Sequence, residues 1–235
     1  MNLKNSIAVV TGGTEGIGLA IARALGRQGS PVAICGRAEP KLKAALKSLA
    51  GSGVHAVGTP CDVTDPKSVE GFADFVGRAL GQPKVLVNNA GIGRFAPLES
   101  MALDDWNDVM STNLRGPFLV TRAFLPAMKS AGEGAIVNVA SLAGRNGFEG
   151  GTAYCASKHG LLGFGKALMF EVRKHNLRVI TVCPGSVKTE FGGPRSEAKS
   201  DRVLHPEDVA DVILATLTLP DRAMVSELDI RPTNP

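Results

Sequence analysis

Apolar residues along this chain fall into short continuous runs that alternate with longer stretches of mixed polarity. The short runs are rich in Val, Ile and Ala and lack alternating polar positions, which is typical of strands buried on both faces of a parallel sheet. Such runs predict strands over residues 7–10, 32–35, 54–57, 85–87, 135–139 and 178–182, and residues 227–230 are predicted as a last short strand.

The longer stretches carry apolar residues at helical spacing. Ile17, Ile21 and Leu25 would share one helix face, and Asp65-Pro66 has the residue types of a helix start. Helices are predicted over residues 16–28, 41–49, a segment that begins after Pro66, 104–128, 152–174 and 206–217. Repeated strand–helix units predict a single α/β domain over residues 1–235, doubly wound around a parallel sheet with helices on both faces.

Composition narrows the class of protein. The chain has 235 residues, of which 44% are apolar and 20% charged, so a disordered or fibrous chain is excluded. No apolar run approaches the ~20 residues that cross a bilayer, and we expect no membrane association. The apolar run at residues 7–10 is too short for a signal-peptide core, which predicts a cytoplasmic protein.

Charge and metal-binding residues exclude further classes. The net charge is +4, but the 26 basic residues are scattered, so we expect no nucleic-acid partner. The four histidines and four cysteines are dispersed and show no metal-ligand spacing. We therefore predict no metal site and reduced, buried cysteine thiols.

A glycine-rich turn follows the first predicted strand. It reads Thr11-Gly12-Gly13-Thr14-Glu15-Gly16-Ile17-Gly18 and opens directly into an amphipathic helix. Glycines allow a sharp turn and close approach of a ligand, and the helix N-terminus offers free N–H groups to a pyrophosphate. The Gly-x-x-x-Gly-x-Gly spacing is one residue longer than the common dinucleotide fingerprint. Its place between strand and helix predicts a dinucleotide site.

The end of the second strand bears on cofactor choice. An NAD site usually has an acidic residue there for the ribose 2′-hydroxyl, but this chain has Gly36 followed by Arg37. A guanidinium can bind a 2′-phosphate through two hydrogen bonds, which favours NADP(H) over NAD(H). Arg37 could also be a solvated loop residue, and Glu15 weakens the preference because a carboxylate repels phosphates.

Two further strand ends carry residues suited to a nucleotide. Asn88-Asn89-Ala90-Gly91 follows the fourth strand, where small residues let a ribose or adenine lie against the backbone. Asp62 and Val63 follow the third strand, within reach of the adenine edge. A turn or helix-capping role for Asp62 is an equal alternative.

The most specific constellation is Ser141, Tyr154 and Lys158. Tyr154, the single tyrosine, lies four residues before Lys158, so the two share a helix face. A phenol has a pKa of ~10, and a neighbouring ammonium lowers it and makes the hydroxyl a usable acid or base. Ser141 follows the fifth strand at the same sheet edge, where it could hydrogen-bond a substrate oxygen.

These motifs, together with Tyr154-Cys155-Ala156-Ser157-Lys158 and Pro184-Gly185, resemble the short-chain dehydrogenase/reductase family in order and spacing. The resemblance implies a Rossmann-like sheet of seven parallel strands, with a cofactor half at about residues 1–140 and a catalytic half at about 141–235. It implies a catalytic tetrad of Asn113, Ser141, Tyr154 and Lys158. In that tetrad Asn113 anchors a water of a proton relay, Ser141 orients the substrate carbonyl, Tyr154 is the general acid, and Lys158 binds the nicotinamide ribose.

The resemblance also implies cofactor contacts. The cofactor-binding residues would be Gly12, Thr14, Glu15, Gly16, Ile17, Gly18, Arg37, Asp62, Val63, Asn89, Ala90, Gly91, Tyr154, Lys158, Pro184, Gly185, Val187 and Thr189. Glu15 departs from the pattern, since many NADP-using members have a basic residue there. Family members often form homodimers or homotetramers through the long helix, in which Gly160, Gly163 and Gly165 leave a thin face.

The resulting hypothesis is a carbonyl reductase or alcohol dehydrogenase that uses NADP(H), with NAD(H) as the second candidate. Its pocket would be lined by residues 93–95, residues 144–148 and the segment after Thr189, which includes a loop predicted at residues 192–201. Phe95, Phe148 and Phe191 would favour a partly apolar substrate, and the candidates are a 3-oxoacyl thioester (carrier protein or CoA), a sugar, a polyol or a small diketone. The alternatives are an NAD-dependent alcohol or sugar dehydrogenase and a non-catalytic nucleotide sensor. Arg173-Lys174-His175 either stabilises a helix end or docks an acidic carrier protein.

Overall fold

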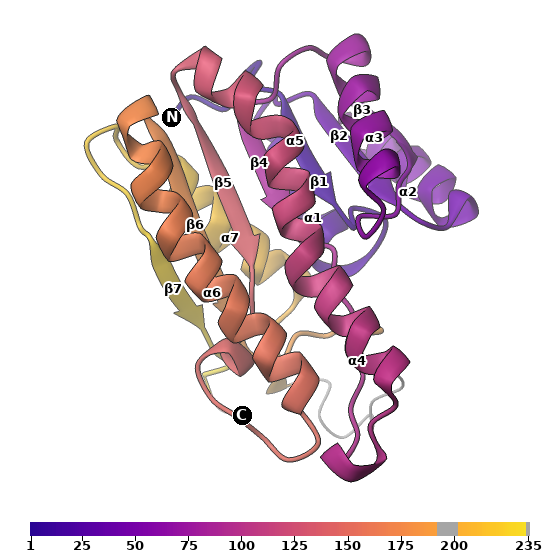
Figure 1. The fold of residues 1–235 in the computed structure, drawn as a ribbon. Coiled ribbons are helices and arrows are strands. Elements are labelled where there is room, and N and C mark those ends of the chain that lie inside the picture. Colours follow the sequence, from indigo (N-terminus) through magenta and orange to yellow (C-terminus); the bar gives the residue numbers. More distant parts are fainter. Residues whose placement is uncertain (192–201, 234–235) are drawn as a thin grey trace.

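The computed structural model describes residues 1–191 and 202–233 and contains a seven-stranded, fully parallel sheet (Figure 1). The loop predicted at residues 192–201 lies outside the described residues. The strand order is β3-β2-β1-β4-β5-β6-β7. The strands are β1 Ala8–Thr11, β2 Val32–Gly36, β3 Ala56–Pro60, β4 Val85–Asn88, β5 Gly134–Val139, β6 Leu177–Pro184 and β7 Glu227–Ile230. The predicted Rossmann-like, doubly wound single domain is confirmed.

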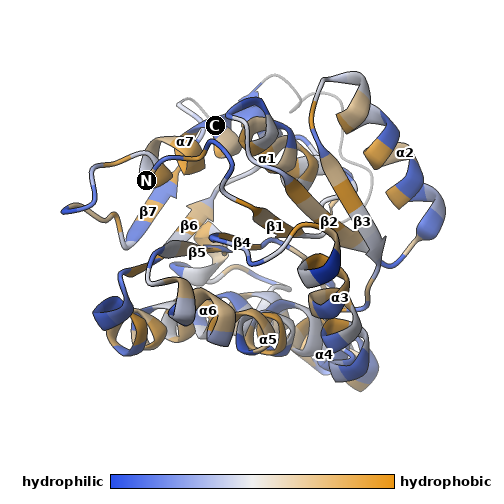
Figure 2. Ribbon diagram, turned by 90° about the horizontal axis from the view of Figure 1, so that it is seen from above, coloured by the Kyte–Doolittle hydropathy of each residue, from blue (hydrophilic) through white to orange (hydrophobic). Residues whose placement is uncertain are grey.

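Helices cover both faces of the sheet, as Figure 2 shows with the sheet seen edge-on between two layers. The α-helices are α1 Gly16–Arg27, α2 Glu39–Gly51, α3 Pro66–Ala79, α4 Leu103–Met110, α5 Gly116–Ala131, α6 Thr152–Val172 and α7 Pro206–Leu217. One face packs against α1, α2 and α7, and the other against α3, α5 and α6. Within the described ranges, none of these helices combines the length and hydropathy needed to cross a membrane.

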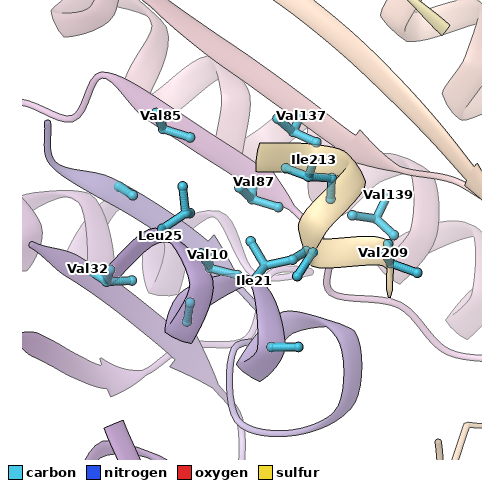
Figure 3. Packing of buried hydrophobic residues seen from close by; sticks show 14 of the residues in the cluster. Val10, Ile21, Leu25, Val32, Val85, Val87, Val137, Val139, Val209 and Ile213 are labelled. Carbon is cyan, nitrogen blue, oxygen red and sulfur yellow. The ribbon is translucent and has the colours of Figure 1, made fainter. Parts of the chain in front are cut away.

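The core is built from the continuous apolar strands that the sequence pattern predicts. In the layer drawn in Figure 3, strand residues such as Val10 and Val137 pack against Ile21 of α1 and Ile213 of α7, and all four are 0–1% exposed. Adjacent strand residues such as Val9 and Ile136 point to the opposite layer, where Phe72 meets Phe124 edge-to-face. Burial of both faces explains why the five central strands show no regular polar alternation.

The third strand begins two residues later than predicted. Val54 donates its N–H to the carbonyl of Leu49, so it closes the end of α2 and does not extend the strand. The pairing with β2 then runs from Ala56 to Pro60. The apolar pattern cannot separate a buried residue of a helix-terminating turn from the first residue of a strand.

The long helix predicted over residues 104–128 is three helical segments. A π-helical turn, Ser111–Arg115, lies between α4 and α5 and keeps them in one continuous path. The predicted start of α3 is confirmed, because the Asp65 side chain accepts hydrogen bonds from the N–H groups of Lys67 and Ser68.

Close contacts hold α6 against its neighbours. A Cβ on Gly165 would lie 2.4 Å from Thr181 Oγ1 on β6, and one on Gly160 would lie 2.8 Å from Leu114 of the π turn. Gly163 has no atom within 4 Å of such a Cβ. The three glycines therefore do not form one thin face. Gly160 and Gly165 pack against different neighbours, and these contacts position the helix that carries Tyr154 and Lys158.

The strand order reverses beside β1, which pairs with β2 on one side and β4 on the other. In sheets of this kind the loops diverge at the carboxyl ends of these strands and leave a crevice for a ligand. The carboxyl ends lie at the lower edge of the sheet in Figure 1, next to α4 and the first turn of α6.

Candidate active site

An open cleft of about 1490 Å³ lies at the carboxyl edge of the sheet. Its walls come from the β1–α1 turn, the loops after β4, β5 and β6, and the start of α6. The predicted site residues that line it are Gly12, Thr14, Glu15, Gly16, Ile17, Gly18, Asn89, Ala90, Gly91, Ser141, Tyr154, Lys158, Pro184, Gly185, Val187 and Thr189. The cleft is larger than a typical small-ligand pocket, which suits a dinucleotide together with a substrate.

The glycine-rich turn forms the floor of the cleft and is locked to the loop after β4. Thr11 Oγ1 accepts hydrogen bonds from the N–H groups of Asn89 and Ala90, both at 3.1 Å. The Asn89 side chain donates to the carbonyls of Thr11 and Gly12 at 3.0 and 3.1 Å. Asn89 thus braces two loops that lie far apart in the sequence.

Two glycines of this turn meet strict backbone requirements. Gly12 has φ +63°, and a Cβ there would lie 2.9 Å from Ala90 Cα. Gly18 would place a Cβ only 2.2 Å from the Gly12 carbonyl oxygen. A side chain at either position would collide with backbone, so the turn can only be this tight with glycine.

Lys158 reaches the cleft from the first turns of α6 and is 4% exposed. Its Nζ donates to the carbonyl of Val139 at 3.0 Å. Burial lowers the pKa of Lys158 to about 8, because the charged form loses hydration. The ammonium is therefore still protonated at neutral pH, inside a region of low dielectric.

Tyr154 lies one helical turn before Lys158, and Lys158 Nζ is 5.7 Å from the centre of the phenol ring. The ring is 9% exposed and packs edge-to-face against Phe95 at 5.5 Å between centroids. Phe191 lies on the ring at 5.6 Å, and Phe148 packs on Phe95 at 5.8 Å. The phenol ring thus lies close both to an ammonium and to an aromatic wall formed by Phe95, Phe148 and Phe191.

Ser141 lies two residues after the end of β5 and precedes a 3-10 turn, Leu142–Gly144. Its Oγ accepts a hydrogen bond from the N–H of Ala143 at 3.1 Å. An accepted bond from the backbone leaves the hydroxyl proton available to a third group. The side chain lines the same cleft as Tyr154 and Lys158.

Asn113 lies behind the cleft, in the π turn, and is fully buried. Its Oδ1 accepts from the N–H of Ile92, while its Nδ2 donates to the Ile92 carbonyl and to Ser157 Oγ, at 2.9 and 3.1 Å. Ser157 in turn donates to the Tyr154 carbonyl at 2.7 Å. Asn113 therefore joins the loop after β4 to the catalytic helix, without lining the cleft.

Three predicted cofactor contacts do not line the cleft. Arg37 is exposed just beyond the end of β2. Asp62 Oδ1 accepts from the N–H and the hydroxyl of Thr64, at 2.9 and 2.8 Å, which is the turn role that we gave as its alternative. Val63 is 6% exposed and belongs to the core. Their contacts with a cofactor remain predictions.

The family model described as short chain dehydrogenase matches residues 6–200. The chain belongs to this family. It is 39% identical to D-threitol dehydrogenase of Mycolicibacterium smegmatis, covering 88% of this chain and 84% of that one. It is 37% identical to 3-oxoacyl-[acyl-carrier-protein] reductase FabG of Pseudomonas aeruginosa, covering 87% and 83%. A crystal structure of an actinorhodin polyketide ketoreductase variant with NADPH matches with a TM-score of 0.91, at 36% identity and 97% and 96% coverage.

In this short-chain dehydrogenase the cleft fits a dinucleotide. Gly12, Gly16 and Gly91 line the cleft without side chains, so a ligand can lie against the backbone there. Glu15 precedes α1 without capping it through a hydrogen bond, so the first N–H groups of the helix remain available to phosphate oxygens. No group of three metal-ligating side chains occurs in residues 1–191 and 202–233.

Several cleft residues of this short-chain dehydrogenase were not predicted. They include Leu19, Ala20, Arg23, Ile92, Ser186, Lys188, Pro206 and Glu207. An ion pair between Glu15 and Lys41, 2.6 Å apart, joins the cleft to α2. These residues carry no local motif, because their place in the cleft depends on how loops and α7 pack together. The predicted pocket segments agree in part. Gly93, Arg94, Phe95, residues 146–148 and residues 190–191 line the cleft, whereas Gly144 and Arg145 do not.

Proposed function

We propose that this chain transfers a hydride between NADP(H) and a carbonyl or alcohol substrate, with Tyr154 as general acid and base. The observation that carries the proposal is the buried ammonium of Lys158 beside the single tyrosine, at the mouth of a cleft shaped for a dinucleotide. The similarity to a ketoreductase crystallised with NADPH supports the choice of cofactor. Residues of about 1–140 would hold the cofactor, and residues of about 141–235 would supply the chemistry.

Lys158 activates the phenol through charge. A protonated ammonium stabilises the phenolate, and the low dielectric around the buried Lys158 strengthens that effect. The Val139 carbonyl holds the ammonium in place. Tyr154 can then give up its proton near neutral pH at a useful rate.

Tyr154 and Ser141 act on the substrate oxygen. Bound nicotinamide supplies or accepts the hydride. In reduction, Tyr154 donates its hydroxyl proton to the carbonyl oxygen, and in oxidation it removes the proton from the alcohol. Ser141 donates a hydrogen bond to the same oxygen, and this bond strengthens as the oxygen gains negative charge. Asn113 positions the helix of Tyr154 through Ser157. By resemblance to the family, it would also anchor the water of a proton relay to Lys158.

The cofactor is proposed to lie along the glycine-rich turn. The first N–H groups of α1 would bind the pyrophosphate, Arg37 the 2′-phosphate, and Asp62 and Val63 the adenine. Lys158 would bind the nicotinamide ribose, and the segment after β6 the carboxamide. That segment lies close to the turn, since a Cβ on Gly16 would be 3.1 Å from Thr189 Cγ2.

Two substrate classes compete for the proposed pocket. The aromatic wall of Phe95, Phe148 and Phe191 favours a partly apolar substrate such as a 3-oxoacyl thioester, and the similarity to a 3-oxoacyl carrier-protein reductase supports it. The similarity to D-threitol dehydrogenase favours a small polyol or sugar. If a carrier protein delivers the substrate, the turn Arg173–His175 offers it three basic side chains.

The test is a panel of carbonyl compounds and alcohols assayed with each nicotinamide cofactor. Loss of NADPH absorbance with a carbonyl substrate would support the proposal, and faster turnover with NADH would favour the NAD-dependent alternative. Tight cofactor binding without hydride transfer to any compound would favour a nucleotide sensor. Ser141, Tyr154 and Lys158 argue against that last alternative, since a sensor needs none of them.

Assembly and compartment belong to the same proposal. Phe118 on α5 and Phe170 on α6 are 44% and 62% exposed, which favours a homodimer or homotetramer formed through these helices. The four cysteines are buried free thiols, in accord with the prediction and with a reducing, cytoplasmic compartment.

A further inference from the structure

An ion pair crosses the edge of the cleft at the point where the chain departs from its family's pattern. Glu15 precedes α1 and does not cap that helix. Its carboxylate lies 2.6 Å from Nζ of Lys41, which belongs to the first turn of α2. The two side chains are 56% and 54% exposed, so a solvent-borne ligand can reach both.

This pair lies next to the end of β2. Thr14, the neighbour of Glu15, packs on Gly36, where a Cβ would lie 2.7 Å from Thr14 Cγ2. Arg37 follows Gly36, and α2 starts two residues later. In a doubly wound sheet the end of the second strand faces the adenosine ribose of a dinucleotide. Lys41 is therefore the α2 cation directed at the ribose end of the cleft.

The charges around Lys41 are arranged asymmetrically. Lys43, two residues further along α2, pairs with Glu39 of its own helix at 2.8 Å. Arg37 makes no ion pair with any residue of the ranges 1–191 and 202–233. Glu15 raises the pKa of Lys41, and Glu190 of the cleft wall adds to this effect, so the ammonium stays charged. A 2′-phosphate with roughly two negative charges would call for more than the one cation of Arg37.

We propose that Lys41 is a second determinant of NADP(H) preference: it binds the 2′-phosphate together with Arg37, while Glu15 holds its ammonium at the cleft and limits the affinity. The inference deepens the proposed function by naming how the site distinguishes its two cofactors. It also explains how a carboxylate is tolerated beside the phosphates, because Lys41 neutralises it.

The proposal predicts opposite changes in NADPH affinity for Lys41→Met and Glu15→Gln, and this difference makes it testable. Lys41→Met removes a charged partner of the phosphate and is expected to weaken NADPH binding roughly tenfold, because a hydrogen bond between two charged groups is lost. NADH binding should change by less than about threefold. Glu15→Gln releases the ammonium, and NADPH binding should become tighter relative to NADH.

The measurement is titration of the folded, substrate-free protein by calorimetry, with NADPH, NADH and the fragments 2′,5′-ADP and 5′-ADP. Lys43→Met is the matched control, because it removes a lysine of the same helix that pairs with Glu39 and not with the cleft residue Glu15. It should leave the ratio of the two dissociation constants unchanged. Arg37→Met combined with Lys41→Met should abolish the preference for 2′,5′-ADP.

Specific outcomes would overturn the inference. An equal loss of NADPH and NADH in Lys41→Met would place the lysine at the pyrophosphate or in the fold, and no loss would remove it from the site. A Glu15→Gln variant with weaker NADPH binding would contradict the limiting role of the carboxylate. These titrations need no substrate, so they stay informative even if the carbonyl panel shows no turnover and the proposed function fails.

Discussion

The charged form of Lys158 is disfavoured by its surroundings, because the side chain is buried. The side chain is 4% exposed, and among the hydrogen bonds of the described residues its Nζ donates to the carbonyl of Val139. Burial lowers the pKa of Lys158 to about 8 from an ordinary value of 10.5. The folded protein therefore binds this proton less tightly than the unfolded chain, and the charged side chain destabilises the fold that contains it.

Lys158→Met should consequently stabilise the protein while removing its activity. The expected gain in the free energy of unfolding is on the order of 1–3 kcal/mol at pH 7. It should be fully present below pH 8, shrink as the pH rises from 8 towards 10.5, and disappear above that range, where both states are neutral. Urea unfolding at pH 7 and pH 10 measures it, with the exposed Lys174→Met as control. A variant less stable than the wild type at pH 7 would contradict this account.

The same pKa sets a limit on the reaction at alkaline pH. Above about pH 8 the free protein loses the ammonium that stabilises the phenolate of Tyr154. We expect kcat/KM for limiting NADPH to fall with rising pH through this value, since this parameter reports groups of the free enzyme. A profile that stays flat to pH 9.5 would show that the charge of Lys158 is not needed.

Local spacing predicted Tyr154 and Lys158 because both side chains belong to one helix. The burial of Lys158 depends on β5 and on the loop after β4, so the sequence could not predict its lowered pKa. Glu15 and Lys41 are 26 positions apart in the sequence, and no local pattern predicts that they form an ion pair. Charge contacts between elements were the least predictable part of the site.

At the scale of elements, the π turn Ser111–Arg115 determines where the catalytic helix lies. Periodicity predicted one helix over residues 104–128, because apolar spacing changes little across a single inserted turn. The structure shows why the turn forms: Asn113 is held inside by bonds to both backbone groups of Ile92 and to Ser157. Such a bulge depends on tertiary hydrogen bonds that a one-dimensional pattern does not contain.

Asn113→Ala should loosen this arrangement. It leaves the N–H and carbonyl of Ile92 without their side-chain partner, which costs about 1–3 kcal/mol in the free energy of unfolding. The loop after β4 should become more mobile, so kcat should fall more than the affinity for NADPH. Thermal unfolding and steady-state assays measure both effects. Asn107→Ala, exposed on α4, is the control, and a loss of the same size there would refute the positioning role.

At the scale of the whole molecule, continuous apolar runs predicted the central strands because β1, β2, β4, β5 and β6 are buried by helices on both faces. The edge strands β3 and β7 are only partly buried. The start of β3 was predicted two residues too early, because Val54 completes the end of α2. The crevice follows from the strand order, in which β1 is flanked by β2 and β4. Right-handed crossovers on both sides of β1 generate that order, so a correct list of elements nearly determines where a ligand binds.

Assembly can be tested on the exposed aromatic residues of the α5–α6 face. The guanidinium of Arg122 lies 5.3 Å from the ring centre of Phe118, and that of Arg173 lies 5.1 Å from the ring centre of Phe170. Both rings are too exposed to support the core of a monomer. Replacing both with Glu should convert a dimer or tetramer into monomers, as measured by light scattering. Leu98→Glu, exposed elsewhere, should leave the mass unchanged. A wild-type protein that is monomeric would remove this part of the proposal.

The most direct test of the central claim is the rate of NADPH oxidation by Tyr154→Phe. This change removes one hydroxyl and keeps the aromatic contacts with Phe95 and Phe191. With a carbonyl substrate that the wild type reduces, kcat should fall by about 10²–10⁴, the usual contribution of a general acid, while the Kd for NADPH changes by less than about threefold. Turnover close to that of the wild type would show that another group delivers the proton, and the assignment of Tyr154 would be wrong.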